Sequence, residues 1–120
     1  MVAWVERHAK AGARVIVIDP ITAVKSGREP WLDDFSSAMK LKDIAYRYEC
    51  SILITTHPRS SAKEPSLSAM AGGSAWSRFA HCVLWLSREK DENAASNRTM
   101  SILKSRHGKG GGMKLSLIHI

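Results

Sequence analysis

One run of β-branched residues constrains the fold more than any other feature of this sequence. The four aliphatic residues of Val15–Ile18 are followed directly by Asp19 and Pro20. Side chains of this kind favour strands, and an unbroken apolar run is typical of a parallel strand buried on both faces. Pro20 cannot donate to a strand ladder, so the strand ends there. We therefore predict a buried parallel strand with one carboxylate at its carboxyl end.

The rest of the chain alternates between predicted helices and predicted strands. In chain order, helices are expected over residues 2–10, 30–45 and 74–79, strands over residues 15–18, 51–56, 81–86, 99–104 and 113–118, and a long loop over residues 58–73. The last two strands flank the Gly-rich sequence HGKGGG, which is typical of a hairpin turn. The order predicts an α/β fold with a mainly parallel sheet flanked by helices and a C-terminal β-hairpin.

Composition narrows the class of protein. The chain has 120 residues and a net charge of +7, with +2 in residues 1–60 and +5 in residues 61–120. Such an excess favours a nucleic-acid partner, or it is simply a solvated basic surface. The longest apolar run, residues 82–86, is far too short to span a membrane. Cys50 and Cys82 form no CxxC pair, so we expect a reduced, cytoplasmic chain.

Three sets of side chains could bind phosphate or a metal ion. Asp19 at the end of a buried strand can hold Mg²⁺ through water, or it can simply begin a turn. His57 ends the next predicted strand, where it can contact a phosphate or only cap the strand. Lys104 and Arg106 share one face of a predicted strand, which suits a phosphate or a solvated hairpin.

Other catalytic classes fit the sequence less well. Asp19, His57 and Ser74 follow the chain order of one class of serine protease, but the segment around Ser74 lacks the last glycine of a nucleophile elbow. The five histidines show no metal-binding spacing. No P-loop is present, because Gly108-Lys109 is followed by glycine where Ser or Thr is required.

Four segments in order resemble successive motifs of the RecA-like hexameric helicase ATPases, most closely the RepA-like and DnaB-like replicative helicases. These segments are VIVIDPITAV, ITTHPRSSAK, AMAGGSAWSRFAHCVLWL and ILKSRHGKGGGMKLSL. The resemblance extends from about residue 13 to the end of the chain. It implies a partial RecA-like P-loop NTPase core that begins with the Walker B strand.

The resemblance also implies roles for individual residues. Asp19 would belong to the Walker B strand and hold Mg²⁺ through water. His57 matches the polar sensor of the γ-phosphate of ATP. Arg59 and Lys63 match the loop that faces single-stranded DNA in the central channel.

Lys104 and Arg106 match the Lys-x-Arg pair that reaches into the nucleotide site of the neighbouring subunit in DnaB-like rings, whereas His81 receives no role. The P-loop strand and the catalytic Glu strand of the family have no match here. Residues 1–120 are therefore expected to be the C-terminal part of the ATPase domain, inactive alone. The complete protein would be a hexameric helicase that uses ATP and Mg²⁺ to move on single-stranded DNA. The alternative is a non-catalytic basic nucleic-acid-binding or assembly module derived from such an ATPase.

Overall fold

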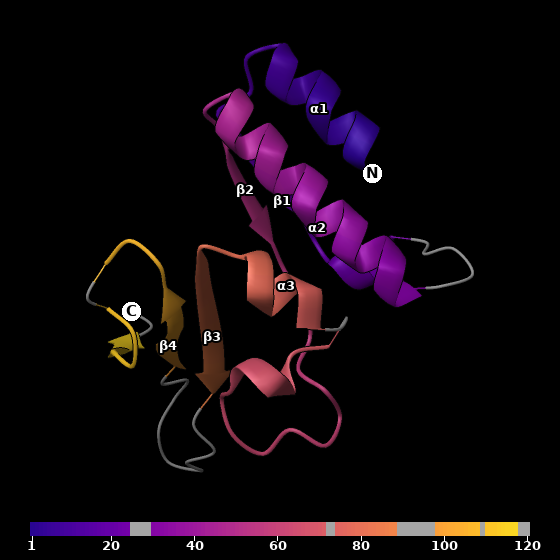
Figure 1. The fold of residues 1–120 in the computed structure, drawn as a ribbon. Coiled ribbons are helices and arrows are strands. Elements are labelled where there is room, and N and C mark those ends of the chain that lie inside the picture. Colours follow the sequence, from indigo (N-terminus) through magenta and orange to yellow (C-terminus); the bar gives the residue numbers. More distant parts are fainter. Residues whose placement is uncertain (25–29, 72–73, 89–97, 109, 118–120) are drawn as a thin grey trace. The chain divides into compact units, whose positions relative to one another are not determined.

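A computed structural model describes residues 1–24, 30–71, 74–88, 98–108 and 110–117. The chain divides into two compact units, whose elements are labelled in Figure 1. The N-terminal unit comprises Met1–Ser60 and Met70–Ala80. The C-terminal unit comprises Ser61–Ala69 and His81–Ile120.

The N-terminal unit is built around one pair of parallel strands. Strands β1 (Val15–Ile18) and β2 (Ser51–Ile54) pair over their whole length. Parallel neighbours cannot be joined by a tight turn. The 3-10 turn η1 (Ile21–Ala23) and the long helix α2 (Pro30–Arg47) make the crossover instead. This arrangement confirms the predicted strand, helix, strand order.

Two helices cover one face of this sheet. Helix α1 (Val2–Lys10) packs beside α2 (Figure 1), and both contribute to the same core as β1. Apolar side chains at helical spacing form this layer, and Val5 of α1 is fully buried. The buried core residues of the unit are Val5, Ala9, Ile16, Ile18, Ile21, Ala38, Leu41, Ile44, Cys50, Ala75 and Trp76.

The other face of the two strands is exposed. Val15 and Val17 of β1 are 66% and 53% exposed, and Leu53 of β2 is 53% exposed. The prediction that the first strand is buried on both faces is therefore wrong for this chain. The physical reason is that α1 and α2 both pack against the side of Ile16 and Ile18. Parallel sheets are normally covered on both faces, so this surface is unusual.

Helix α3 (Ser74–Phe79) packs on the N-terminal half of α2. Its Trp76 is 7% exposed, and the ring of Phe79 meets the ring of Phe35 edge-on at a centroid distance of 5.0 Å. Phe35 and Met39 of α2 are 40% and 49% exposed. In the described part of the chain, no helix is long and apolar enough to cross a membrane.

The C-terminal unit is an antiparallel sheet. Its strands, β3 (Cys82–Arg88), β4 (Arg98–Ser105) and β5 (Lys114–Leu117), lie in that order. A 3-10 turn, η2 (Leu67–Ala69), belongs to the same unit. The α/β class and the C-terminal hairpin are confirmed, while parallel pairing among the described strands is confined to β1 and β2.

Candidate functional site

Asp19 and Thr55 lie at the carboxyl ends of the two parallel strands. The hydroxyl of Thr55 donates a hydrogen bond to Oδ1 of Asp19. The backbone fixes the same edge, because the N–H of Thr55 donates to the carbonyl of Ile18 at 3.0 Å. The N–H of Ile21 in turn donates to the carbonyl of Thr55 at 2.9 Å. The carboxylate of Asp19 is thus held in place although the residue is exposed.

This arrangement fits a magnesium ion bound through water. Mg²⁺ takes few protein ligands, keeps several waters, and is completed by substrate phosphates. One fixed, exposed carboxylate with a neighbouring hydroxyl meets that need. The described residues contain no cluster of three or more His, Cys, Asp or Glu side chains that could hold a metal alone. A site at Asp19 would therefore depend on phosphate oxygens.

Sequence reasoning identified Asp19 but missed Thr55. Both residues directly follow a strand, and the parallel register that sets Ile18 opposite Ile54 brings them side by side. The sequence shows a hydroxyl one residue beyond the second strand. Its pairing with Asp19 can be predicted only when the register of the two strands is known.

His57 lies two residues beyond Thr55 and is exposed. Its carbonyl accepts a hydrogen bond from the N–H of Ala71 at 3.0 Å, and Pro58 forms a β-bridge with Met70. His57 is therefore on a segment anchored to the far end of the long loop. Its predicted contact with a γ-phosphate stays a prediction.

Arg59 also takes part in anchoring this loop. Its Nε donates to the carbonyl of Met70 at 3.1 Å. The hydroxyl of Thr56 donates to the carbonyl of Ala71 at 3.2 Å. Part of the guanidinium of Arg59 is thus used to close the loop, which leaves its predicted role in DNA binding as an expectation.

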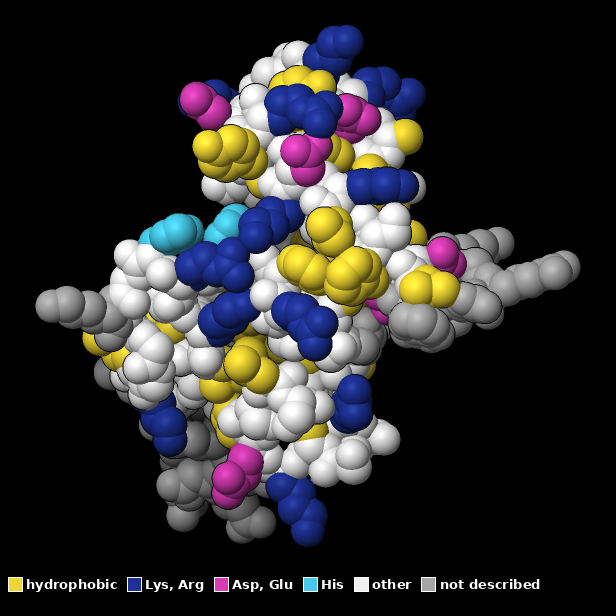
Figure 2. Space-filling view, in the orientation of Figure 1, with side chains coloured by type: hydrophobic (Ala, Val, Ile, Leu, Met, Phe, Trp, Pro, Cys, Tyr) yellow, Lys and Arg dark blue, Asp and Glu magenta, His cyan; other side chains and the backbone are white. Residues whose placement is uncertain are grey.

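The remaining predicted residues belong to the C-terminal unit. Lys63 is exposed in the segment Ser61–Ala69. Lys104 of β4 is half-buried opposite Val83, and Arg106 is exposed just beyond the strand. Asp19 and His57 therefore belong to the N-terminal unit, and Lys104 and Arg106 belong to the C-terminal unit. Lys and Arg side chains are frequent on the face shown in Figure 2, in keeping with the net charge of +7.

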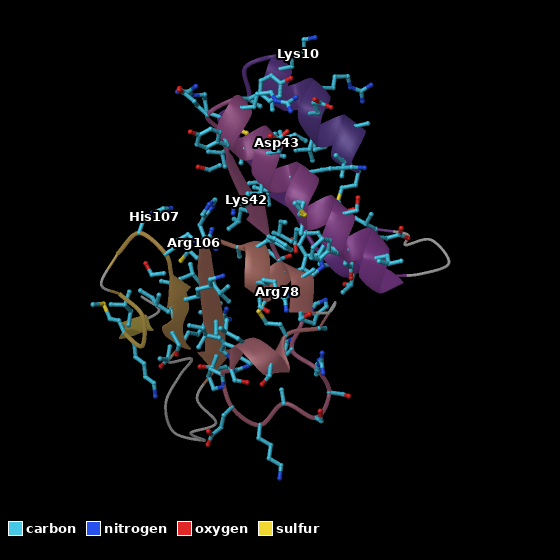
Figure 3. The ribbon with its side chains drawn as sticks, viewed as in Figure 1. Lys10, Lys42, Asp43, Arg78, Arg106 and His107 are labelled. Carbon is cyan, nitrogen blue, oxygen red and sulfur yellow. The ribbon has the colours of Figure 1, made fainter. Side chains whose placement is uncertain are left out.

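A pair of histidines flanks Arg106. The backbone N–H of Arg106 donates to the carbonyl of His81 at 2.9 Å. The rings of His81 and His107 lie with their centroids 5.5 Å apart and their planes at 35°. Figure 3 shows Arg106 and His107 together at the end of β4. Sequence analysis gave His81 no role, and the ring contact was not predictable from residues so far apart in the chain.

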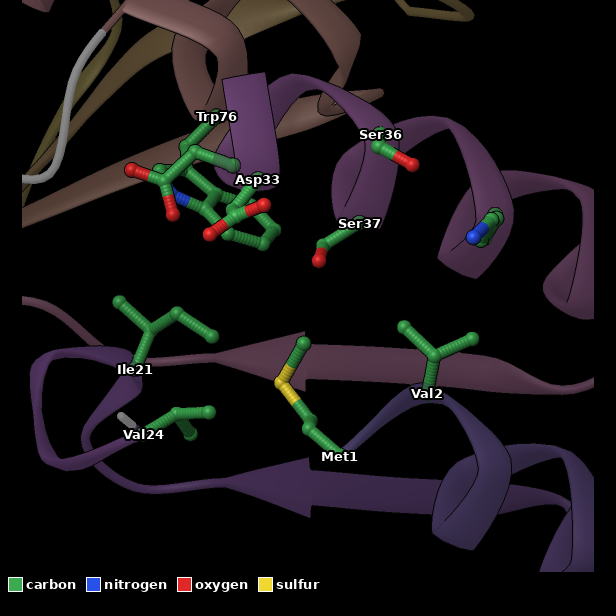
Figure 4. A pocket seen from close by; sticks show the side chains of 10 residues that line it. Met1, Val2, Ile21, Val24, Asp33, Ser36, Ser37 and Trp76 are labelled. Carbon is green, nitrogen blue, oxygen red and sulfur yellow. The ribbon is translucent and has the colours of Figure 1, made fainter. Parts of the chain in front are cut away.

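The N-terminal unit also contains a cavity of about 280 Å³, shown in Figure 4. Apolar side chains from the start of the chain, from η1 and the residue after it, and from α3 line one part of the cavity. Polar side chains of α2 line the rest. The lining residues are Met1, Val2, Ile21, Val24, Asp33, Asp34, Ser36, Ser37, Lys40 and Trp76. Asp33 lies in the first turn of α2, where a negative charge favours the helix dipole.

Asp34 is electrostatically perturbed in this cavity. Burial raises the pKa of its carboxyl above the usual value of 3.8. A hydrogen bond with the side chain of Trp76 acts in the opposite direction, and the charge of Asp33 adds to the rise. Because desolvation penalises the charged form, the folded unit favours a protonated Asp34 more than the unfolded chain does.

Comparisons with known proteins agree with the architecture. No family model matches this sequence, and no curated protein matches it. A solved structure, that of a KaiC-like protein from the hyperthermophilic archaeon Pyrococcus horikoshii, superimposes with a TM-score of 0.65 at 20% identity. The chain therefore has an α/β fold like that of the matching part of this KaiC-like protein. The similarity covers 96% of this chain but 50% of the KaiC-like chain, so the present chain spans half of that length.

Proposed function

We propose that this chain is the C-terminal part of a RecA-like, DNA-dependent ATPase of the replicative-helicase kind. One observation carries the proposal: the carboxylate of Asp19 is held by Thr55 at the carboxyl ends of adjacent parallel strands. Ligands of open α/β sheets bind outside this edge. The KaiC-like fold supports a nucleotide as that ligand.

The proposed chemistry is phosphoryl transfer from ATP to water. Enzymes of this class mainly position the reactants and neutralise developing charge. Asp19 would hold Mg²⁺ through water, and His57, on the segment after β2, would contact the γ-phosphate. The sequence contains no P-loop. The proposal therefore requires a phosphate cradle from a segment outside these 120 residues.

The basic residues would serve neighbouring subunits and DNA. Arg106 is exposed beyond β4, so it can reach a nucleotide held by another subunit of a hexameric ring. Lys104 would accompany it on the same strand. Arg59 and Lys63 would contact phosphates of single-stranded DNA, and the loop contact between Arg59 and Met70 would set the position of the guanidinium.

Calorimetric titration with Mg·ATP tests the proposal. The 120-residue chain alone is expected to show no saturable binding in the micromolar range, because it lacks the phosphate cradle. The reading frame upstream of Met1 should encode G-x-x-x-x-G-K-[ST], and the extended chain should hydrolyse ATP faster with single-stranded DNA. A tight, Mg²⁺-dependent isotherm for the short chain would contradict the assignment of Asp19 to an incomplete site.

The second candidate is a non-catalytic, basic nucleic-acid-binding or assembly module. The charge of +5 in residues 61–120 favours it. Both candidates predict salt-dependent binding of single-stranded oligonucleotides, since the contacts are to phosphates. Only the ATPase predicts that a P-loop-bearing extension makes this binding depend on ATP. Unchanged oligonucleotide affinity with and without Mg·ATP in the extended chain favours the module.

A further inference from the structure

The corner where β3 begins and β4 ends carries two histidines in ring contact and, on the backbone between the strands, Arg106. Cys82 of β3 pairs with Ser105 of β4. The next residues beyond this pair are His81 and Arg106, and the N–H of Arg106 donates to the carbonyl of His81. The same register sets the side chains of His81 and Arg106 on the same face of the sheet, as directly opposed cross-strand neighbours. The ring of His107 then lies against the ring of His81.

All three side chains of this corner are accessible. His81, Arg106 and His107 are exposed, and they follow or precede strands whose pairing fixes the backbone. The backbone that carries these hydrogen-bond donors is therefore held by the pairing of β3 with β4. Planar guanidinium groups and imidazole N–H groups both suit the oxygens of a phosphate.

The local charge is positive throughout. The strand ends that meet here, residues 81–84 and 103–108, contain no Asp or Glu, and their remaining titratable groups are Cys82 and Lys104. Elsewhere in the described part of the C-terminal unit, Glu64 is the one acid, against Lys63, Arg88, Arg98 and Lys114. This excess of positive charge would attract an anion.

Protonation and anion binding must be linked at this corner. Histidine is the side chain that changes charge between pH 5 and pH 8. An anion held at this corner attracts a charged imidazolium ring more strongly than a neutral imidazole ring. By linkage, an anion that favours the charged rings binds more tightly as the pH falls.

We infer that His81, Arg106 and His107 form a phosphate-binding site in which anion binding is coupled to protonation of the two imidazoles. Arg106 supplies a charge that is constant with pH, and the histidines supply one that is not. The inference rests on the proposed function only for the source of the phosphate, which would be the nucleotide of a neighbouring subunit. The site itself is a property of this chain.

Histidine side-chain NMR of the 120-residue chain tests the site, with sodium sulfate as probe and sodium chloride at matched ionic strength as reference. Sulfate is a tetrahedral dianion whose charge is constant between pH 5.5 and 8. We expect sulfate to move the ring resonances of His81 and His107 and to shift the midpoints of their titrations upward. Affinity should be at least about 3-fold higher at pH 6 than at pH 8.

Variants separate this site from general charge screening. The double variant H81Q/H107Q should abolish most of the pH dependence, while R106A should weaken sulfate binding at both pH values. His8 is a matched control, because its ring also lies beside another ring, that of Trp4 at 4.2 Å, on helix α1. Equal sulfate shifts at His8 and at His81, or pH-dependent binding that survives in H81Q/H107Q, would overturn the inference.

Two further ligands identify the source of the phosphate. Tighter binding of Mg-free ATP than of an oligothymidylate at equal phosphate concentration indicates a terminal nucleotide phosphate. The reverse order indicates a nucleic-acid backbone and contradicts the nucleotide as source. Failure of the sulfate titration refutes this site but leaves the proposed ATPase untouched, because that proposal depends on Asp19 and an external P-loop.

Discussion

The hydroxyl of Thr55 donates to the carboxylate of Asp19 across two adjacent parallel strands, although 36 residues separate them in the chain. This contact joins the ends of β1 and β2 at the edge where ligands of α/β sheets bind. The register of the two strands therefore determines the position of the carboxylate of Asp19.

Replacing Thr55 with Val removes the hydroxyl but keeps the branched shape. We expect the free energy of unfolding to fall by about 0.5–1.5 kcal/mol, the usual net value of one hydrogen bond. Urea titration followed by tryptophan fluorescence measures it. Thr56→Val is the matched control, because it removes the bond to the carbonyl of Ala71 and leaves Asp19 untouched. A Thr55 variant as stable as the parent would show that the contact contributes nothing.

Two neighbouring positions of β1 should respond in opposite ways to truncation. Ile16 is 4% exposed, whereas Val17 is 53% exposed. Ile16→Ala should cost about 2–5 kcal/mol, as expected for a buried aliphatic side chain. Val17→Ala should cost less than about 1 kcal/mol, because little apolar surface is buried there. Similar losses at both positions would mean that the second face of the strand is covered in solution.

Replacing Asp19 with Asn in a chain that carries a P-loop should separate chemistry from folding. The Asn oxygen can still accept the hydrogen bond from Thr55, so the melting temperature should hardly change. Hydrolysis of ATP should fall by at least about 10²-fold, because one strong electrostatic contribution is lost. A steady-state assay of phosphate release measures the rate of hydrolysis. Normal turnover would reduce Asp19 to a turn residue.

Mixing two inactive variants tests the proposed role of Arg106 in a neighbouring site. Arg106→Ala should lower DNA-stimulated hydrolysis by about 10³–10⁵-fold, the usual effect of losing an arginine finger. It should change the free energy of unfolding by no more than about 0.5 kcal/mol, since Arg106 is exposed. Rings mixed from Asp19→Asn and Arg106→Ala subunits should regain part of the activity. No recovery, although mixed rings form, would exclude a role in trans.

The raised pKa of Asp34 predicts a pH-dependent effect on stability. The folded unit binds this proton more tightly than the unfolded chain, so stability is lost as the pH rises from 3.8 through the raised pKa of the folded state. Asp34→Asn should therefore stabilise the protein at pH 7, by less than about 1 kcal/mol because the group is only half-buried. The gain should vanish below pH 3.8.

Asp33→Asn is the control for Asp34, because Asp33 lies in the first turn of α2 and should favour the helix dipole. Its replacement should not stabilise the protein at pH 7. Urea unfolding of both variants at several pH values makes the comparison. A gain for Asp34→Asn that is equal at pH 3 and pH 7 would contradict the assigned cause.

Local patterns in the sequence predicted the helices, the strands and the place of Asp19 at the end of a strand. The β-branched run at 15–18 and the predicted helix over residues 30–45 specify a strand and its crossover helix, because side-chain spacing follows backbone geometry. The pairing of successive parallel strands follows from the same order. The strand pattern therefore predicts Asp19 at the carboxyl end of the sheet, where it lies.

Relations between distant residues were decided by tertiary structure. Thr55 became the partner of Asp19 only through the register of β1 and β2, and His81 met His107 only through the register of β3 and β4. The exposure of Val17 depends on which face of the sheet α1 and α2 cover. Four successive aliphatic residues do not indicate which face that is, because the side chains on both faces are equally apolar. A strand pattern states that a residue can be buried, whereas the packing of other elements determines whether it is.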